Sequence, residues 1–226
     1  MDIKPYFYFI GTTIFVPLWI ILFVKKENRK DMLLIGTIVG ILAVIVEHLY
    51  SRSDYWNPQF IFPNFPFESF YYGLIFGGIS TELYELIFQK RNSLKKLHPN
   101  RFKILPFFIL FTALCFLFFV DMLELKSTIA YLIPPLGIGL TVAIFRKDLF
   151  ISQIWNGLFL TIITFIMFQI LLLINPLLFE EYWYLGSETI YIIGVPLEEL
   201  AFGFFVGFGL CNLYEFLFGY SLIKEK

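Results

Sequence analysis

Residues 66–88, PFESFYYGLIFGGISTELYELIF, and residues 196–218, PLEELAFGFFVGFGLCNLYEFLF, are two copies of one apolar segment. Aligned without gaps they share eight identities in 23 positions. Six of the eight are neither Leu nor Phe, so an apolar composition does not explain the match. Each copy opens with Pro and carries Glu two residues later. This similarity predicts an internal duplication.

The match continues upstream of both segments with small gaps. Residues 29–31 correspond to 146–148, both Arg-Lys-Asp, and 54–56 correspond to 181–183, an acid followed by Tyr and Trp. Each copy would therefore contain three helices. Because three is odd, a direct fusion would invert the second copy, and an intervening helix restores its orientation. The predicted plan is 3+1+3, with parallel repeats related by an axis along the membrane normal.

The overall composition indicates a membrane protein. The 226 residues are 58% hydrophobic, 21% aromatic and only 15% charged, and the mean hydropathy is +0.76. Too few polar side chains are present to cover a soluble domain, so lipid must cover the remainder. The net charge of −1 lacks the basic excess of nucleic-acid-binding proteins. Both cysteines lie within apolar runs, which argues against a disulfide framework or a cysteine metal site.

Seven stretches are long enough to span a bilayer as helices. They are approximately 6–24, 32–50, 66–88, 104–120, 130–145, 149–174 and 196–218. The first is long enough to be a retained span rather than a cleaved signal. The fifth is short and contains Pro134 and Pro135, which makes its start the least certain boundary.

The positive charges indicate an orientation. Residues 25–30, 90–103, 146–147 and 224–226 hold fourteen of the seventeen Lys and Arg residues, and a seven-helix topology places all of these on one side. Basic residues collect in cytoplasmic loops. The chain is therefore predicted to be an all-α, multi-pass protein of the cell membrane, with its N-terminus outside and its C-terminus in the cytoplasm. The predicted parts are a first repeat, 1–98, a connecting helix, 99–127, and a second repeat, 128–226.

Glutamates near the predicted outer helix ends are candidates for chemistry. Glu68 and Glu198 follow the duplicated Pro, and Glu199 is adjacent. An acid in the first turn stabilises any helix start, but stability alone does not require the same acid in both copies. Glu47 and His48 lie at the outer end of the second span. Because ionisable groups at membrane depth are costly, they are candidates for function.

Two further patterns have structural explanations beside functional ones. Glu82, Glu85 and Glu215 form a second acidic set at the predicted cytoplasmic end, where nearby Lys and Arg could neutralise them. Each copy also has a Gly-x-x-x-Gly pair, a spacing that allows helices to pack closely. If these two faces pack against each other, Glu68 and Glu198 come close together. The pairs are Gly73 with Gly77, and Gly203 with Gly207.

The segment Pro196-Leu197-Glu198-Glu199-Leu200-Ala201-Phe202 resembles the Pro-x-Glu-Glu-x-x-Phe motif of the membrane-integral lycopene cyclases. The duplication, the three-helix unit and the connecting helix also resemble that family, so the likeness spans nearly the whole chain. Two positions depart from the family pattern: Ser69 stands where a second acid is common, and Gly203 where a second Phe is usual.

The resemblance implies cofactor-independent cyclisation of the ψ-ends of linear carotenoids such as lycopene, with no flavin and no metal. The implied catalytic residues are Glu198, Glu199 and Glu68. A proton is added to a terminal C=C, the ring closes through a tertiary cation, and a ring proton leaves. A buried carboxyl can stay neutral as the acid while a neighbouring carboxylate stabilises the cation. The residues expected to bind substrate are Pro196, Phe202, Pro66, Phe70, Glu47 and His48.

The expected partners are a lipophilic polyene in the bilayer and membrane lipid, with no nucleic acid; whether the chain forms a homo-oligomer is left open. Three other functions remain as alternatives. Water capture of the same cation would make a carotenoid end-group hydratase. The 3+1+3 plan also occurs in small-solute transporters, although the centres of these helices are apolar. A non-catalytic assembly protein is the third. No nucleotide-binding glycine motif is present, and two histidines, His48 and His98, are too few for a histidine metal cluster.

Overall fold

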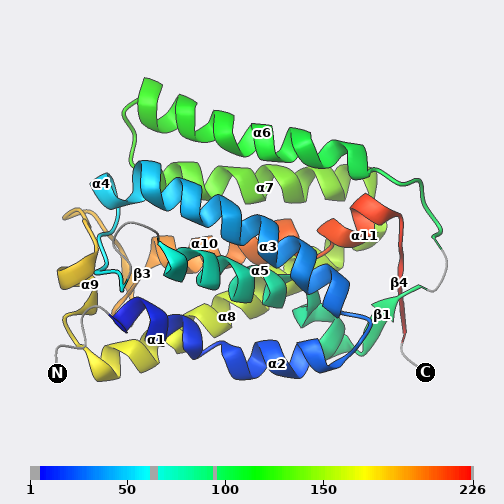
Figure 1. Ribbon diagram of the computed structural model, residues 1–226, viewed down its shortest axis with the longest axis horizontal. Coiled ribbons are helices and arrows are strands. Elements are labelled where there is room, and N and C mark those ends of the chain that lie inside the picture. Colours follow the sequence, from blue (N-terminus) through cyan, green and yellow to red (C-terminus); the bar gives the residue numbers. More distant parts are fainter. Residues whose placement is uncertain (1–5, 62–65, 94–95, 225–226) are drawn as a thin grey trace.

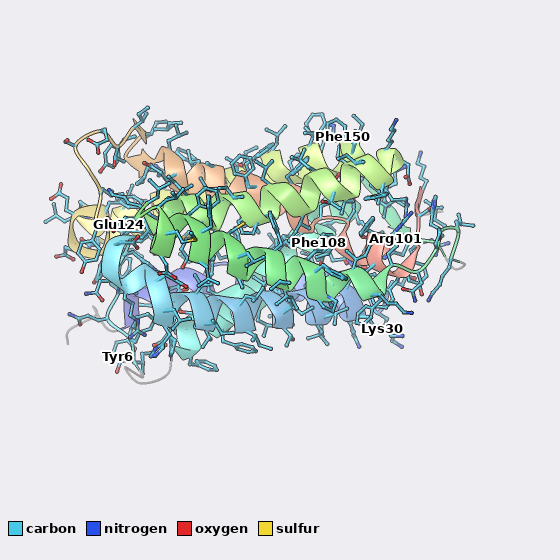
Figure 2. All side chains as sticks on the ribbon, turned by 90° about the horizontal axis from the view of Figure 1, so that it is seen from above. Tyr6, Lys30, Arg101, Phe108, Glu124 and Phe150 are labelled. Carbon is cyan, nitrogen blue, oxygen red and sulfur yellow. The ribbon has the colours of Figure 1, made fainter. Side chains whose placement is uncertain are left out.

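The computed structural model describes residues 6–61, 66–93 and 96–224, and it is a bundle of helices that run alongside one another (Figure 1). The N-terminal helix begins at one end of the bundle, and the last strand lies at the other. We name these the α9 end and the β1 end after elements found there. Figure 2 shows Tyr6 and Glu124 at the α9 end and Lys30 and Arg101 at the β1 end.

The long helices correspond closely to the apolar runs of the sequence. A break after Thr13 divides the first run into two helices, and a turn at Cys211 and Asn212 divides the last. The helices are α1 (Phe7–Thr13), α2 (Val16–Val24), α3 (Arg29–Val46), α4 (Arg52–Asp54), α5 (Phe67–Phe88), α6 (Leu105–Phe116), α7 (Ser127–Phe145), α8 (Phe150–Ile174), α9 (Leu178–Tyr182), α10 (Leu197–Leu210) and α11 (Leu213–Phe218).

Short elements extend or connect these helices. Two π-helical turns, Glu47–Ser51 and Leu117–Met122, continue α3 and α6, and two 3₁₀ turns, Phe102–Ile104 and Lys147–Leu149, precede α6 and α8. The strands are β1 (Lys90–Asn92), β2 (Tyr191–Ile192), β3 (Val195–Pro196) and β4 (Leu222–Lys224). β1 pairs with β4 and β2 pairs with β3, both antiparallel.

Six helical segments in the described part of the chain are long and apolar enough to cross a membrane. They are Phe7–Val24, Arg29–Ser51, Phe102–Met122, Ser127–Phe145, Lys147–Ile174 and Leu197–Phe218. The multi-pass helical class is confirmed, and each segment overlaps one predicted span. The chain is therefore a multi-pass membrane protein.

The remaining predicted span, 66–88, is the 22-residue helix α5, which is not among the six. It buries several polar side chains, including Glu68, Ser80, Glu82 and Glu85, because other helices surround it. These polar side chains are tolerated inside a helical bundle, but they lower the mean hydropathy of the segment. The seven-helix 3+1+3 arrangement, its orientation and its repeat limits remain predictions.

The paired glycines pack helices within each predicted copy. A Cβ on Gly73 would lie 2.6 Å from the Cα of Gly40 in α3, and a Cβ on Gly207 would lie 2.9 Å from the Cα of Gly157 in α8. These close approaches join α5 to α3 and α10 to α8, the two helix pairs that contact each other most extensively. The glycine faces therefore do not pack against each other. The backbone of α3 lies against the glycines of α5, and the backbone of α8 lies against those of α10.

The fifth predicted span is longer than its sequence suggested. Helix α7 begins at Ser127 and runs through Pro134 and Pro135. Asp54 accepts hydrogen bonds from the backbone N–H of Ser127 at 2.5 Å and from its hydroxyl at 2.6 Å. A side-chain acceptor at this position satisfies a free amide of the first turn. The boundary depends on a residue more than seventy positions away, which the local sequence does not show.

Candidate active site

A cavity of about 250 Å³ lies inside the bundle, and we call it the central cavity. Residues of α1, α3, α5, α6, α7, α8 and α10 line it. Most of the lining is apolar and aromatic. Its polar groups include the carboxyls of Glu47, Glu198 and Glu199, the hydroxyl of Tyr55 and the indole N–H of Trp183. A mainly apolar pocket with a few convergent polar groups is the usual form of a small-molecule site.

Glu199 is the most completely bonded carboxyl of this cavity. It lies in the first turn of α10, with 8% of its surface exposed. Its Oε1 accepts hydrogen bonds from the Tyr55 hydroxyl and from Nε1 of Trp183, the latter at 2.7 Å. Burial raises the pKa of the Tyr55 phenol, so Tyr55 remains a neutral donor. Two donors fix one oxygen of Glu199.

Glu47 is a second buried carboxyl that lines the cavity. It opens the π-helical turn at the end of α3, with 3% of its surface exposed. Nε1 of Trp56 donates a hydrogen bond of 3.0 Å to its Oε2. Nε of Arg52 lies 3.9 Å from its Oε1. Single π-helical turns within helices occur often at functional sites.

The two tryptophans that hold these carboxyls form one unit. Trp56 and Trp183 are partners in an isolated antiparallel β-bridge, and their ring centroids are 5.1 Å apart. Backbone N–H groups of Asn57 and Tyr184 donate to the carbonyls of Tyr182 and Tyr55 at 2.8 and 2.7 Å. We call residues 55–57 with 182–184 the Trp pair. It links a loop of each predicted copy and presents one indole N–H to each carboxyl.

Four of the predicted site residues line the cavity. Glu198, Glu199 and Glu47 do so, as does Phe202, whose ring stacks on Phe76 with centroids 6.1 Å apart. The Phe76 ring is also part of the lining.

Five of the predicted site residues lie elsewhere among the described residues: Glu68, Pro66, Phe70, Pro196 and His48 are not part of the lining. Glu68 is fully buried, and its Oε1 accepts a 2.6 Å hydrogen bond from the backbone N–H of Ile61. His48 is exposed, because the next residue of a helix points about 100° away from the inward-facing Glu47. No observed contact tests the predicted approach of Glu68 to Glu198.

Sequence reasoning missed the residues that hold the carboxyls. Tyr55, Trp56 and Trp183 were noted only as a repeated element, although they come within hydrogen-bonding distance of Glu47 and Glu199. The repetition of Tyr and Trp after an acid was the available signal. The indole N–H needs a partner when it is buried, which makes a repeated interfacial Trp a candidate donor to a nearby carboxylate.

A second group of buried acids lies at the β1 end, away from the cavity. Glu82, Glu85 and Glu215 were predicted there, and Asp31 joins them; all four are nearly inaccessible to solvent. Nδ2 of Asn92 donates a 2.8 Å hydrogen bond to Asp31. Within the described ranges no group of three or more His, Cys, Asp or Glu residues could hold a metal ion.

The fold and the cavity define a multi-pass helical membrane protein that presents fixed carboxyls to an apolar, aromatic-walled site. Comparison with known families adds a specific assignment. Residues 126–217 match the family model described as lycopene cyclase, a range that includes Trp183, Glu198, Glu199 and Phe202. The match confirms the predicted resemblance over this range, and together with the apolar helices it supports a lycopene cyclase-type membrane protein of carotenoid biosynthesis. No curated protein and no solved structure matches the chain.

Proposed function

We propose that this protein cyclises the ψ end groups of linear carotenoids such as lycopene to ionone rings by acid–base catalysis without a redox step. The family match supports carotenoid cyclisation in general. The finer proposal depends on one observation, the placement of Glu199. Its carboxyl is fixed by Tyr55 and Trp183 at the wall of an apolar cavity, within the motif that carries the resemblance.

The proposed reaction begins with proton transfer to a terminal C=C of the substrate. Glu199 is the proposed donor, with Glu198 beside it on the same helical turn and also in the cavity lining. The hydrogen bonds from Tyr55 and Trp183 both reach Oε1 of Glu199, which leaves Oε2 to carry the proton. A terminal alkene is a weak base, so the acid must be held close and water kept out.

The next step joins two carbons of the chain and leaves a tertiary cation in the ring. Aromatic ring faces attract cations, and Phe76 and Phe202 stack in the cavity wall. Loss of a ring proton then forms the ring double bond. The proton gained and the proton lost balance, so the product has the mass of the substrate. No external electron donor enters the sequence.

The size of the cavity favours an end group as its occupant. Pockets for drug-sized ligands are roughly 300–1,000 Å³, and the central cavity is about 250 Å³. A C40 polyene is longer than such a pocket, so the rest of the substrate would extend from it. In the proposal this remainder lies in the bilayer, where a lipophilic polyene is dissolved.

Substitution of the two adjacent glutamates tests the function. Glu199→Gln, Glu198→Gln and wild type are expressed in lycopene-producing cells, with Glu188→Gln in an exposed loop as control, and the pigments are separated by chromatography. General acid catalysis contributes about 10²–10⁴-fold, so Glu199→Gln should lower cyclic product at least about 100-fold at equal protein level. Unchanged cyclic product in both Glu199→Gln and Glu198→Gln would contradict the assignment.

Mass spectrometry of the wild-type product separates the alternatives. When the purified protein acts in D₂O, the donated proton comes from an exchangeable carboxyl, so each ring formed should carry one deuterium from solvent. A hydratase would instead add the mass of water to each modified end. A protein that returns lycopene unchanged in liposomes would not be a cyclase.

A further inference from the structure

The carboxyls that line the central cavity come from both halves of the chain, and the two with observed indole donors are Glu47 and Glu199. Glu47 opens the π-helical turn that continues α3, and Glu199 lies in the first turn of α10. Both are buried, both line the cavity, and each accepts a hydrogen bond from one indole of the Trp pair. The lycopene cyclase match begins at residue 126 and does not include Glu47.

The two carboxyls occupy positions that differ between the copies. Gly36 lies against Gly77 as Gly157 lies against Gly207, so the second helices of the copies correspond at an offset of 121 residues beyond a small gap that follows the Arg-Lys-Asp match. At that offset Phe168 is the counterpart of Glu47, and Phe168 also lines the cavity. In the third helices, which correspond at an offset of 130, Ser69 is the counterpart of Glu199. Each copy therefore supplies one carboxyl where the other has none.

The partners of the two carboxyls also differ. The observed hydrogen-bond donors to Glu199 are a phenol and an indole, both neutral. Glu47 has an indole donor too, but the guanidinium of Arg52 lies 3.9 Å from its other oxygen. A nearby cation pairs with a carboxylate and not with a neutral acid. Acid–base catalysis needs one group in each form at the start, and these surroundings provide for both.

We propose that Glu47 is the second catalytic carboxyl of the site and the base of the cyclisation. This inference rests on the proposed function. Glu199 gives its proton to the terminal C=C, and the π electrons of a neighbouring C=C form the new carbon–carbon bond. The Glu47 carboxylate faces the resulting cation and removes a ring proton. The electron pair of that C–H bond becomes the ring double bond, and proton exchange of both glutamates with water restores the starting forms.

Glu47→Gln is the direct test, in the full-length protein reconstituted in liposomes that contain lycopene. We expect cyclic product to fall at least about 100-fold, the loss typical of a missing general base. Glu47→Asp keeps a carboxylate and should recover at least a tenth of the wild-type rate. Glu188→Gln, in an exposed loop, should act at the wild-type rate.

Product composition distinguishes a base from a residue that only supports the fold. If Glu47 takes the ring proton, the residual product of Glu47→Gln should shift toward other double-bond positions or toward a water adduct of the cation. A purely structural defect lowers all products in proportion. Wild-type rate and wild-type product ratio in Glu47→Gln would overturn the inference, whereas a wild-type protein without cyclic product would overturn the proposed function instead.

A milder variant decides the matter if Glu47→Gln does not fold. Trp56→Phe removes the indole N–H that holds Glu47, and it keeps an aromatic side chain at this position and the carboxyl of Glu47. We expect this variant to fold with an unfolding temperature only a few degrees lower, because one buried hydrogen bond is lost, and to cyclise about tenfold more slowly, the loss typical of one hydrogen bond that positions a reacting group. A wild-type rate in Trp56→Phe together with inactivity of Glu47→Asp would contradict the proposed role.

Discussion

The glycine pairs predict a large difference between two equivalent substitutions, Gly73→Ala and Gly203→Ala. A Cβ on Gly73 would lie 2.6 Å from Cα and 2.7 Å from N of Gly40, both backbone atoms of α3. A Cβ on Gly203 would meet mainly the Thr164 side chain, with Oγ1 at 2.8 Å. Backbone atoms can move only if whole helices separate, whereas a threonine hydroxyl can rotate away.

The distances set the magnitudes. Ordinary Cβ contacts begin at 3.4 Å, so α3 and α5 would have to separate by about 0.8 Å to accept Gly73→Ala. Overpacking of this kind costs about 3 kcal/mol, the upper part of the usual range. Alanine returns about 1 kcal/mol through its helix propensity. We therefore expect a loss of about 2 kcal/mol in the free energy of unfolding for Gly73→Ala and almost no change for Gly203→Ala.

The assay is unfolding of both purified variants and wild type in the same detergent, followed by intrinsic tryptophan fluorescence. The four tryptophans include Trp56 and Trp183, which line the central cavity, so the signal reports on that cavity. Because α3 also positions Glu47, Gly73→Ala should lower cyclisation as well as stability. Equal stability of the two variants, or a greater loss in Gly203→Ala, would refute the packing described for α3 and α5.

Three further results are expected. Asn156→Leu should lower the free energy of unfolding by about 1–3 kcal/mol in the same assay, because its amide donates to backbone carbonyls of α5 and α10 at 2.7 and 2.9 Å. Since the pKa of Tyr55 is raised, its contribution to stability is complete below about pH 10 and is lost at higher pH; an alkaline unfolding series should show a smaller loss in Tyr55→Phe. Ile193→Gly should raise the unfolding temperature slightly, because the φ of Ile193 is 49° and a β-branched residue is strained there; a lower temperature would argue against strain.

Much of the helical layout was predictable because membrane spans are limited by length and apolarity. The expected run 149–174 is observed as a span from Lys147 to Ile174, and 104–120 as one from Phe102 to Met122. The boundaries differ by only a few residues because few charged residues interrupt these runs. Helix α5 is the instructive exception: its ends were expected correctly, but its buried acids make it too polar for the same criterion.

The candidate site was only partly predictable, because a repeat identifies equivalent positions and not their contacts. The motif pointed to Glu198, Glu199 and Phe202, which all line the cavity. The same pattern pointed equally to Glu68, whose carboxyl instead accepts a backbone N–H. The inward direction of Glu47 and its indole partner depend on a π-helical turn and on the contact between two distant loops. The local periodicity of the sequence predicts neither the π-helical turn nor the contact between the two loops.

The pairing of β1 with β4 has a consequence for how this protein is made. Residues 90–92 leave the ribosome more than a hundred residues before 222–224, their only strand partner among the described residues. The backbone N–H of Ser93 donates a hydrogen bond to the carbonyl of Ser221, which is also synthesised late. During synthesis this end of α5 therefore stays without its β-partner until the last helices have been inserted. A chain that lacks residues 222–224 would have no β4 to pair with β1. We expect quality-control proteases to recognise such an incompletely paired protein.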